Sequence, residues 1–431
     1  MPGLPYTTYS TFEELVAATD ARHIEPERVT SPGTAEDPTD HGFFFYNCQQ
    51  QELLQVDPSG RYLLALRVRF EGRDVRADDK AEVGIVDLEN DNRWTAIGES
   101  TAWNWQQGNR LQWVPGSAEE VIWNDRSAAG QSFVSRVYNL RTRQTRTLPK
   151  PVYTISPDGG TALTHDFERM KHGGTDYVGI PDRNAGIWAP EDSHIWKMDI
   201  DTGKSKPLVS AADMVGRMYP PDHNPDPEAT LYFFREGFNP SGTRFIFFVK
   251  DARPGARART EGYSASLEGD DIRYLYKEPS HHFWIDDRTV MDNGWHTPQD
   301  GSDEVRGYFV FRDDGTGDPK ELLYEAPNGH ITLSRDGHWI LTDTYNMNGY
   351  IHLYMYHLPS KRLVPLAKLE THLQRKQVVE SAGYYRIDLH PRFSPDGRTV
   401  SIDSSHEGLG RQIYLLDIGH IVDHPPEAQS Q

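Results

Sequence analysis

The sequence predicts an all-β protein: a seven-bladed β-propeller of four-stranded antiparallel blades, with residues 1–431 forming a single domain. The first observation behind this prediction is a turn rich in Pro, Asp, Ser and Gly that recurs seven times. The second is that the turns are flanked by segments in which apolar and polar residues alternate, as they do in strands. Repeated four-stranded units of roughly forty to eighty residues are typical of propeller blades. A pair of β-sandwiches is the alternative, but repetition along the whole chain favours the propeller.

The recurring turns mark the first hairpin of each predicted blade. In the sequence Ser-Pro-Asp-Gly, Pro presets φ, Asp hydrogen-bonds to its own backbone and Gly adopts a positive φ. The seven turns lie at 57–60, 115–117, 156–159, 239–242, 285–288, 334–337 and 394–397. A third strand with a similar ending is expected in several blades, at 84–88, 195–200, 353–358 and 413–418.

Residues 1–40 are predicted to be an N-terminal extension, and they are a candidate for closing the ring of blades. Residues 10–16 have the sequence of a capped helix start, and residues 30–40 are rich in turn-forming residues. Longer interruptions of the strand pattern are expected to be loops on one face, where loops carry function disproportionately. They lie at 165–190, 211–229, 252–272 and 368–384.

The composition limits the classes of function. The net charge of −19 argues against a nucleic-acid or anionic-membrane partner. The sequence has no run of about 18 apolar residues that would predict a transmembrane helix, and its N-terminus lacks the basic and apolar regions of a signal peptide. The single Cys48 cannot form an internal disulfide, so we expect a cytoplasmic protein. The oligomeric state stays open.

Polar residues cluster just ahead of the recurring turns. In a propeller the innermost strand of each blade lines the central channel, so residues at equivalent positions of different blades converge. The channel of a purely structural propeller also holds water, and polar residues there need no other ligand. The candidate substrate-binding residues on these segments, and in the loop after residue 403, are His41, Gln49, Asn104, Gln106, Arg235, Arg386 and His406.

Histidines occur at this position in three successive blades, which indicates a metal site. His281 or His282, His330 and His390 would supply imidazole ligands, and Asp388 would supply a carboxylate. Asp388 and His390 are two residues apart on an extended segment, so both side chains lie on one face. This mixture of ligands suits Mn²⁺, Zn²⁺ or Fe²⁺ better than Ca²⁺.

Acidic and basic residues elsewhere give weaker signals. Asp343 and Asp403 end strands in blades six and seven, and we expect both to be structural. Arg257 and Arg259 lie in a predicted loop, where they would either recruit a carboxylate substrate or remain solvated. The sequence contains no nucleophile-elbow motif and no phosphate-binding loop.

The C-terminal half of the chain resembles the oligogalacturonate lyases, a family of seven-bladed propeller polysaccharide lyases that degrade pectin fragments in the bacterial cytoplasm. The resemblance rests on HHFWIDD at 281–287, NGHITLSRDG at 328–337 and YYRIDLHPRFSPDGRTVSIDSSHEGLGRQIYLLDI at 384–418. The segment HGFFFYNCQQQELLQVDPSGRYLLAL at 41–66 also resembles the first blade of that family. About half of the chain is covered, and the middle blades match only in outline.

The resemblance implies a Mn²⁺ site held by three histidines and a glutamine. His330 and His390 match two of the histidines, while Asp388 stands in place of the third and Tyr385 in place of the glutamine. His281 matches a further active-site histidine. For the catalytic arginine of the family, Arg257 and Arg259 are the candidates.

The implied reaction is metal-assisted β-elimination on a uronic-acid oligosaccharide, which yields a 4,5-unsaturated product. The C5 proton lies α to the carboxylate, so a metal ion or an arginine can stabilise the charge that develops when a base removes the proton. The altered ligand set permits a uronate substrate other than oligogalacturonate. The alternative is a non-catalytic TolB-like propeller that binds a protein or carbohydrate partner and needs no metal.

Overall fold

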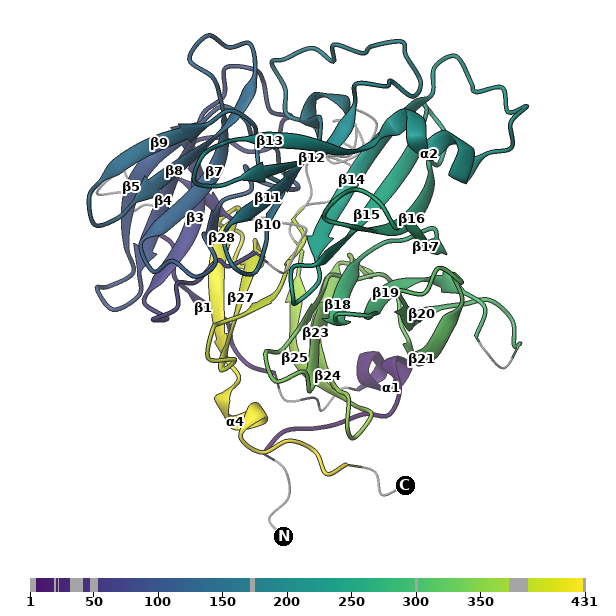
Figure 1. Ribbon diagram of the computed structural model, residues 1–431. Coiled ribbons are helices and arrows are strands. Elements are labelled where there is room, and N and C mark those ends of the chain that lie inside the picture. The colour runs from purple at the N-terminus through teal and green to yellow at the C-terminus, as the bar shows by residue number, and fades with distance from the viewer. Residues whose placement is uncertain are drawn as a thin grey trace.

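The computed structural model describes residues 5–18, 21, 23–31, 42–46, 53–170, 175–298, 301–371 and 387–428. Within these ranges the protein is a seven-bladed β-propeller, and every blade is a four-stranded antiparallel sheet (Figure 1). The predicted fold class is therefore confirmed, and the alternative of two β-sandwiches is wrong. None of the helices in the described ranges is long and apolar enough to cross a lipid bilayer.

Six blades are formed by four strands that follow one another along the chain, with the first strand of each blade innermost. Blade one contains β2 (Phe43–Phe45), β3 (Tyr62–Val68), β4 (Ala81–Asp87) and β5 (Arg93–Ser100). Blade two contains β6 (Gln112–Trp113), β7 (Glu120–Arg126), β8 (Phe133–Asn139) and β9 (Gln144–Leu148). Blade three contains β10 (Thr154–Ile155), β11 (Thr161–Thr164), β12 (His194–Asp199) and β13 (Ser205–Ser210). Blade four contains β14 (Thr230–Phe238), β15 (Arg244–Ala252), β16 (Arg259–Ser266) and β17 (Arg273–Lys277). Blade five contains β18 (His282–Asp286), β19 (Thr289–His296), β20 (Val305–Arg312) and β21 (Pro319–Glu325). Blade six contains β22 (Ile331–Leu333), β23 (Trp339–Asp343), β24 (Tyr350–His357) and β25 (Arg362–Glu370).

All seven predicted turns connect the first two strands of a blade. The turn after β26 shows how the sequence forms them. The amide of Gly397 donates to the Ser394 carbonyl at 2.9 Å, and Gly397 has φ of 72°, in the left-handed region that glycine tolerates best. Asp396 accepts a hydrogen bond from the Arg398 amide at 3.1 Å, which fixes the start of β27. The same side-chain and backbone contacts recur at 156–159 and 334–337.

Blade seven combines both ends of the chain. Its three inner strands are β26 (Arg392–Phe393), β27 (Thr399–Ser404) and β28 (Gln412–Asp417), and its outermost strand is β1 (Glu27–Arg28). Glu27 pairs with Leu415 and Arg28 with Tyr414, so an N-terminal strand joins the last blade to the rest of the ring. In Figure 1 the yellow strands of blade seven lie beside blade one.

Helices are few, and they lie outside the blades. The helix predicted near residue 10 is α1 (Phe12–Ala17), where Thr11 and Glu14 form a capping box. Phe12 and Leu15 of this helix pack into a buried cluster with blade six. The region 211–229, predicted to be a loop, contains α2 (Ala211–Met218), and 252–272 contains the strand β16. The described ranges also contain two short elements, η1 (Phe167–Arg169) and α4 (Gly419–Val422).

The core consists of apolar clusters between neighbouring blades. Trp103 and Trp105 pack edge to face at 5.1 Å between ring centroids and close the junction of blades one and two. Between blades four and five, Phe248 and Trp284 belong to one buried cluster. In every blade the chain enters the innermost strand at one end of the channel, and the loop from the second to the third strand lies at that same end. We call this end the entry face.

Candidate metal centre

Three neighbouring blades place histidines at the entry face. His281 directly precedes β18, His330 directly precedes β22, and His390 lies two residues before β26. Because these inner strands are neighbours around the channel, the segments ahead of them converge. All three side chains are buried, with exposed fractions of 2%, 0% and 1%.

His330, Asp388 and His390 form the tightest part of this group. One ligand atom from each of the three side chains lies within 4.8 Å of the other two. His330 Nε2 is 3.8 Å from Asp388 Oδ2, and the rings of His330 and His390 have centroids 4.2 Å apart. His330 Nε2 is buried, and the structure gives it no hydrogen-bond partner. A divalent ion with ligand bonds of about 2.0–2.2 Å fits this set, which we call the His–Asp–His triad.

Asp343 fixes the orientation of His330. Its Oδ1 accepts the His330 backbone N–H at 2.7 Å, and His330 Nδ1 donates to the same carboxylate at 2.9 Å. Because Nδ1 carries the proton, Nε2 presents its lone pair toward Asp388. A carboxylate behind a ligating imidazole is the usual way in which proteins orient a metal ligand. Asp343 was expected to be structural, and its position beside His330 gives it this additional role.

His390 has an unusual backbone conformation. Its φ is 43°, in the left-handed region, although it is not glycine and it precedes Pro391. Such a residue costs roughly 1–3 kcal/mol and persists only where its surroundings hold it. Here Arg392 Nη1 donates to the His390 carbonyl at 2.7 Å, and the Asp403 amide donates to the Leu389 carbonyl at 2.9 Å. Strain of this kind is characteristic of functional sites.

His281 lies next to the triad but outside it. Its ring centroid is 4.5 Å from that of His330. Nδ1 is 3.0 Å from Ser280 Oγ and 3.3 Å from Asn328 Oδ1, while Nε2 is buried without a hydrogen-bond partner. Burial, reinforced by the charge of Arg235, lowers the pKa of His281 well below its usual value, so the imidazole is neutral. His282, the alternative ligand, instead packs edge to face against Phe248 at 5.1 Å.

Arg235 is the buried cation of the site. The register between β14 and β15 shifts between Phe234 and Gly237, so the inner strand contains a bulge. Arg235 lies in this bulge with φ of 57°, and bulges commonly re-aim a side chain beside an active site. Its charge contributes to the lowered pKa values of His281, His282 and Lys250. The guanidinium therefore lies close to the histidines.

A second buried cluster lies on the channel side of blades two to four. His165 Nδ1 is 2.7 Å from Glu236 Oε1, and both side chains are almost fully buried. The ring of Tyr153 lies between His165, at 4.8 Å, and the guanidinium of Arg110, at 3.9 Å. No turn or repeat in the sequence marks Arg110 or His165 as a site residue.

A cavity beside the triad lies between blades six and seven. It has a volume of about 720 Å³, and both Asp388 and Tyr345 line it. Tyr345 packs edge to face on His330 at 5.2 Å, so the cavity adjoins the triad through Tyr345 and Asp388. The rest of the wall is partly apolar and partly polar, with Ile351, Leu369, Ile387, Leu389, Asn346, Asn348, Ser404 and Ser405 among its residues.

The two predicted catalytic arginines have other partners. Arg257 is 74% exposed and pairs with Glu278 at 2.9 Å. Arg259 is paired with Glu261 and lies over the ring of Tyr219 at 4.3 Å. No contact joins either side chain to the His–Asp–His triad in the described part of the chain. Arg235, in contrast, lies close enough to His281 and His282 for its charge to lower the pKa of both.

The predicted substrate-binding residues do not all lie at one place. Asn104 Oδ1 accepts the amides of Gln106 and Gln107, and its Nδ2 donates to the Thr175 carbonyl, so Asn104 holds a local turn. Gln106 is buried beside it, and His406 bonds to Ser404 Oγ at 2.8 Å in the loop after β27. Three predicted substrate-binding residues, His41, Gln49 and Arg386, lie outside the described ranges, as does the predicted metal ligand Tyr385.

Comparisons with known proteins show the fold. No protein-family model matches the chain, and no curated protein sequence matches it. Among solved structures, the oligogalacturonate lyase from Vibrio parahaemolyticus is similar with a TM-score of 0.59 and 15% identity, and the match covers 96% of each chain. An oligogalacturonate lyase in complex with manganese gives the same values. TolB from Acinetobacter baumannii matches with a TM-score of 0.36 and 16% identity over 72% of this chain and 65% of TolB. The chain therefore has the propeller fold of the oligogalacturonate lyases over nearly its full length.

Proposed function

We propose that the protein is a polysaccharide lyase that cleaves uronic-acid oligosaccharides by β-elimination. The observation that carries this proposal is the buried His–Asp–His triad with His281 and Arg235 beside it at one end of the channel. A neutral imidazole, a buried guanidinium and a set of metal ligands are the groups that removal of a proton α to a carboxylate requires. The similar fold of an oligogalacturonate lyase that binds manganese supports it.

His330, Asp388 and His390 would hold the metal ion. The donor set of two imidazoles and one carboxylate fits Mn²⁺, and the buried lone pair of His330 Nε2 has no other use in the structure. When bound, the ion would supply Lewis acidity that stabilises negative charge on a uronate carboxylate.

The other residues supply proton transfer and charge. His281 is neutral and its Nε2 is available, so it suits the general base that removes the C5 proton. Arg235 then stabilises the charge that develops on the carboxylate. The bond from C4 to the glycosidic oxygen breaks as the C4–C5 double bond forms. The leaving oxygen takes a proton from water, and His281 returns the proton that it removed to the solvent. The products are a 4,5-unsaturated uronate and a shortened saccharide.

The cavity between blades six and seven gives the substrate a place beside these groups. Its volume of about 720 Å³ falls in the range of ligand pockets, and its mixed lining suits sugar rings. The competing proposal, a non-catalytic TolB-like propeller, requires no orientation of His330 by Asp343 and no strain at His390. Those two features favour the enzyme.

The test is a screen of oligogalacturonides and other uronate oligosaccharides with the purified protein. The expected result is formation of the conjugated unsaturated uronate, detected by its ultraviolet absorbance, with loss of activity in EDTA and recovery with added Mn²⁺. Metal content per chain is measured in parallel. A protein that holds no metal and forms no unsaturated product from any uronate would contradict the proposal.

A further inference from the structure

Arg306 lies at the entry face, close to the candidate metal centre, although no turn or motif marks it in the sequence. It is the second residue of β20, and its carbonyl accepts the Ala326 amide at 3.2 Å. Two residues after Ala326, Asn328 contacts His281 Nδ1. The backbone of Arg306 is therefore tied to the segment that positions His281 and leads into His330.

The side chain of Arg306 points toward blade six. Tyr308, two residues along the same strand and so on the same side, has its hydroxyl in contact with Thr342 of blade six at 2.5 Å. Tyr345, whose ring packs on His330 and lines the large cavity, is among the groups that act electrostatically on Arg306. Arg306 thus lies near the junction of the triad and the cavity.

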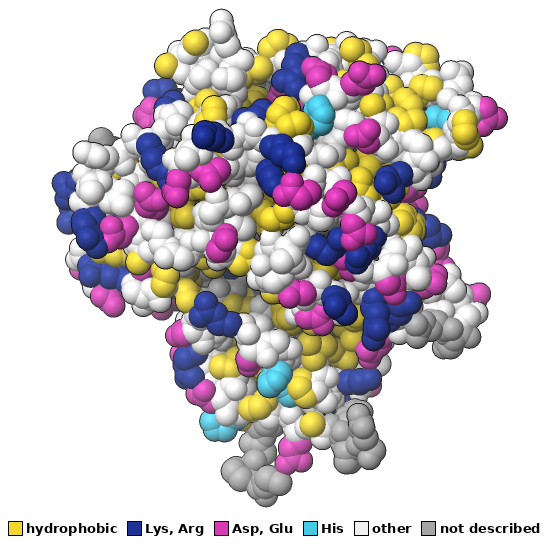
Figure 2. Space-filling model, viewed as in Figure 1, with side chains coloured by type: hydrophobic (Ala, Val, Ile, Leu, Met, Phe, Trp, Pro, Cys, Tyr) yellow, Lys and Arg dark blue, Asp and Glu magenta, His cyan; other side chains and the backbone are white. Residues whose placement is uncertain are grey.

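Among the described residues, Arg306 has no carboxylate partner, whereas several arginines of the neighbouring blades have one. Neighbouring blades pair theirs closely, as in Arg244 with Asp313 at 2.6 Å and Arg273 with Asp271 at 2.5 Å. Acidic and basic side chains also alternate over the visible surface (Figure 2). Arg306 is half-buried, its Nε is buried without a hydrogen-bond partner, and no ion pair joins it to a described residue. Burial of an uncompensated charge is costly, so it calls for a reason.

Asp292 is the acid whose charge acts most on Arg306, but no ion pair joins these two side chains. Asp292 is fully buried, and burial raises the pKa of its carboxyl. Its Oδ1 accepts the Ser280 amide at 3.2 Å, and His296 Nε2 lies 3.6 Å from Oδ2. Oδ2 has no hydrogen-bond partner in the described part of the chain, so Asp292 attracts Arg306 without bonding to it, and the terminal nitrogens of Arg306 keep the capacity to bind an anion.

We infer that Arg306 binds a carboxylate of the substrate and determines the preference for uronates over neutral sugars. A guanidinium presents a planar fork that matches a carboxylate with two parallel hydrogen bonds. This inference rests on the proposed function and deepens it, because it assigns recognition of the acid group to a residue outside the triad. Arg306 acts on specificity, and it takes no part in proton transfer.

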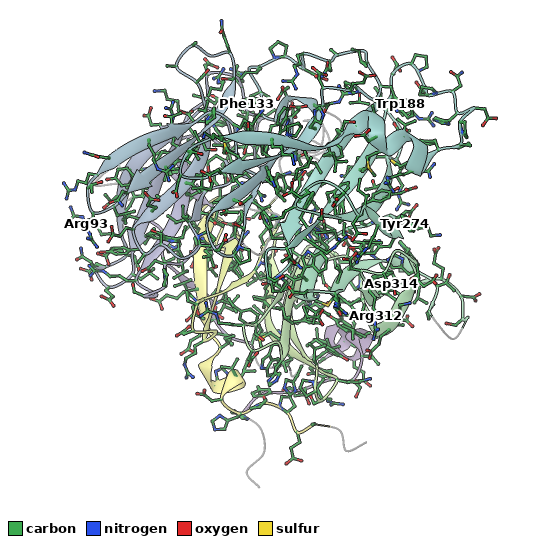
Figure 3. The ribbon with its side chains drawn as sticks, in the orientation of Figure 1. Arg93, Phe133, Trp188, Tyr274, Arg312 and Asp314 are labelled. Carbon is green, nitrogen blue, oxygen red and sulfur yellow. The ribbon has the colours of Figure 1, made fainter. Side chains whose placement is uncertain are left out.

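The test combines a variant with a change in the ligand. Arg306→Gln removes the charge, and Arg306→Lys keeps the charge without the fork. Arg312→Gln is the matched control, because Arg312 is exposed on the same side of β20, about 20 Å farther along the strand. Figure 3 labels Arg312 close to Asp314, at the end of β20 away from Arg306. Each variant is assayed with a uronate disaccharide and with its neutral methyl ester, and thermal unfolding confirms folding.

The expected result is a KM for the free acid that rises roughly 10–100-fold in Arg306→Gln, with partial recovery in Arg306→Lys. The KM for the ester and all values of Arg312→Gln should stay at those of the unmodified protein. An equal rise in KM for the acid and the ester would show that Arg306 only packs the site. An unchanged KM for the acid would also overturn the inference.

Binding measurements separate this inference from the proposed function. Calorimetric titration with galacturonate and with galactose needs no turnover. If no uronate is eliminated but galacturonate binds and Arg306→Gln abolishes that binding, the lyase proposal fails and the assignment of Arg306 stands. If elimination proceeds with the same acid preference in Arg306→Gln, the assignment fails and the lyase proposal stands. A protein that binds neither sugar contradicts both.

Discussion

At the scale of single residues, His330 has two distinct sets of contacts. Its backbone and Nδ1 are held by Asp343, and Nε2 faces Asp388 without a hydrogen-bond partner. The first set makes the residue part of the fold, and the second makes it available as a ligand. A substitution therefore affects stability and function by different amounts.

We predict that His330→Ala loses bound metal and lowers lyase turnover by about 10²-fold or more, because an electrophile is worth several kcal/mol to the transition state. The free energy of unfolding should fall by no more than about 1–2 kcal/mol, which is common for substitutions without a large cavity. The measurements are metal per chain, product formation and thermal unfolding. His338→Ala is the control, because His338 is on the same blade with its side chain 59% exposed. Wild-type turnover in His330→Ala would make the metal-assisted mechanism wrong.

Lys250 gives the site a pH-dependent contribution to stability. It lies over the ring of Phe234 at 4.1 Å, and burial lowers its pKa from the usual 10.5 to about 7. Between these two values the unfolded chain binds more protons than the folded chain, so stability rises with pH across this range. Below pH 7 both states carry the proton, and the folded protein bears the whole cost of the partly desolvated charge.

We predict that Lys250→Met stabilises the protein by about 1–2 kcal/mol at pH 6, less at pH 8.5 and not at all above about pH 10.5. We expect the lower end of the destabilisation that buried lysines usually cause, because the side chain of Lys250 keeps part of its surface exposed. Denaturant unfolding across this pH range measures the effect. Lys206→Met, on an exposed lysine paired with Glu268, is the control. A gain that does not change with pH would contradict the explanation.

At the scale of elements, the approach of the segment before β22 to the end of β23 determines where His330 lies. Gly329 allows this approach, because a Cβ there would lie 1.8 Å from the carbonyl oxygen of Asp343. That oxygen belongs to the backbone, which cannot move aside without shifting the residue that holds His330. The position of the imidazole therefore depends on a glycine in the neighbouring position.

We predict that Gly329→Ala destabilises the protein by roughly 2–4 kcal/mol, as overpacking against backbone does, and weakens metal binding. Gly337→Ala in the following turn is the matched control. Gly337 has φ of 74° and open space around its Cβ position, so its replacement should cost only about 1 kcal/mol and leave the metal site intact. Chemical unfolding and metal titration distinguish the two. Equal metal affinity in both variants would show that the close approach does not position His330.

The elements also show which features the sequence could predict. The seven hairpin turns and the convergence of His281, His330 and His390 follow from local patterns, because each turn fixes the strand ahead of it. Arg235 was a candidate substrate-binding residue from its place ahead of a turn, but the bulge that positions it has no local signal in the sequence. Arg306 and Tyr345 lie near the triad through contacts between blades, and a single sequence contains no local signal for such contacts. Arg257 and Arg259 were candidates for binding a carboxylate substrate because they are arginines in a predicted loop. In the structure Arg257 pairs with Glu278 and Arg259 pairs with Glu261.

At the scale of the whole molecule, the ring is closed by residues far from the last blade in sequence. The N-terminal segment first pairs Tyr9 with Leu363 on the outer strand of blade six, then places α1 on that blade, and then adds β1 to blade seven. Thr30 Oγ1 donates to Gln412 and accepts the Ile413 amide, which extends this contact. Blade seven also leads into the triad through Asp388 and His390. The blade that closes the ring is therefore also the blade that supplies Asp388 and His390 to the triad.

Two truncations separate closure from the packing of α1. Removal of residues 1–25 deletes α1 and keeps β1, whereas removal of residues 1–30 deletes both and exposes the edge of β28. We predict that the shorter truncation lowers stability and leaves metal affinity unchanged, because blade seven stays four-stranded. The longer truncation should lower stability further, weaken metal binding, and promote association through the open strand edge. Thermal unfolding, metal titration and light scattering measure the three effects. If the two truncated proteins bind metal equally well, the N-terminal strand does not support the site, and the triad is held by blades five to seven without it.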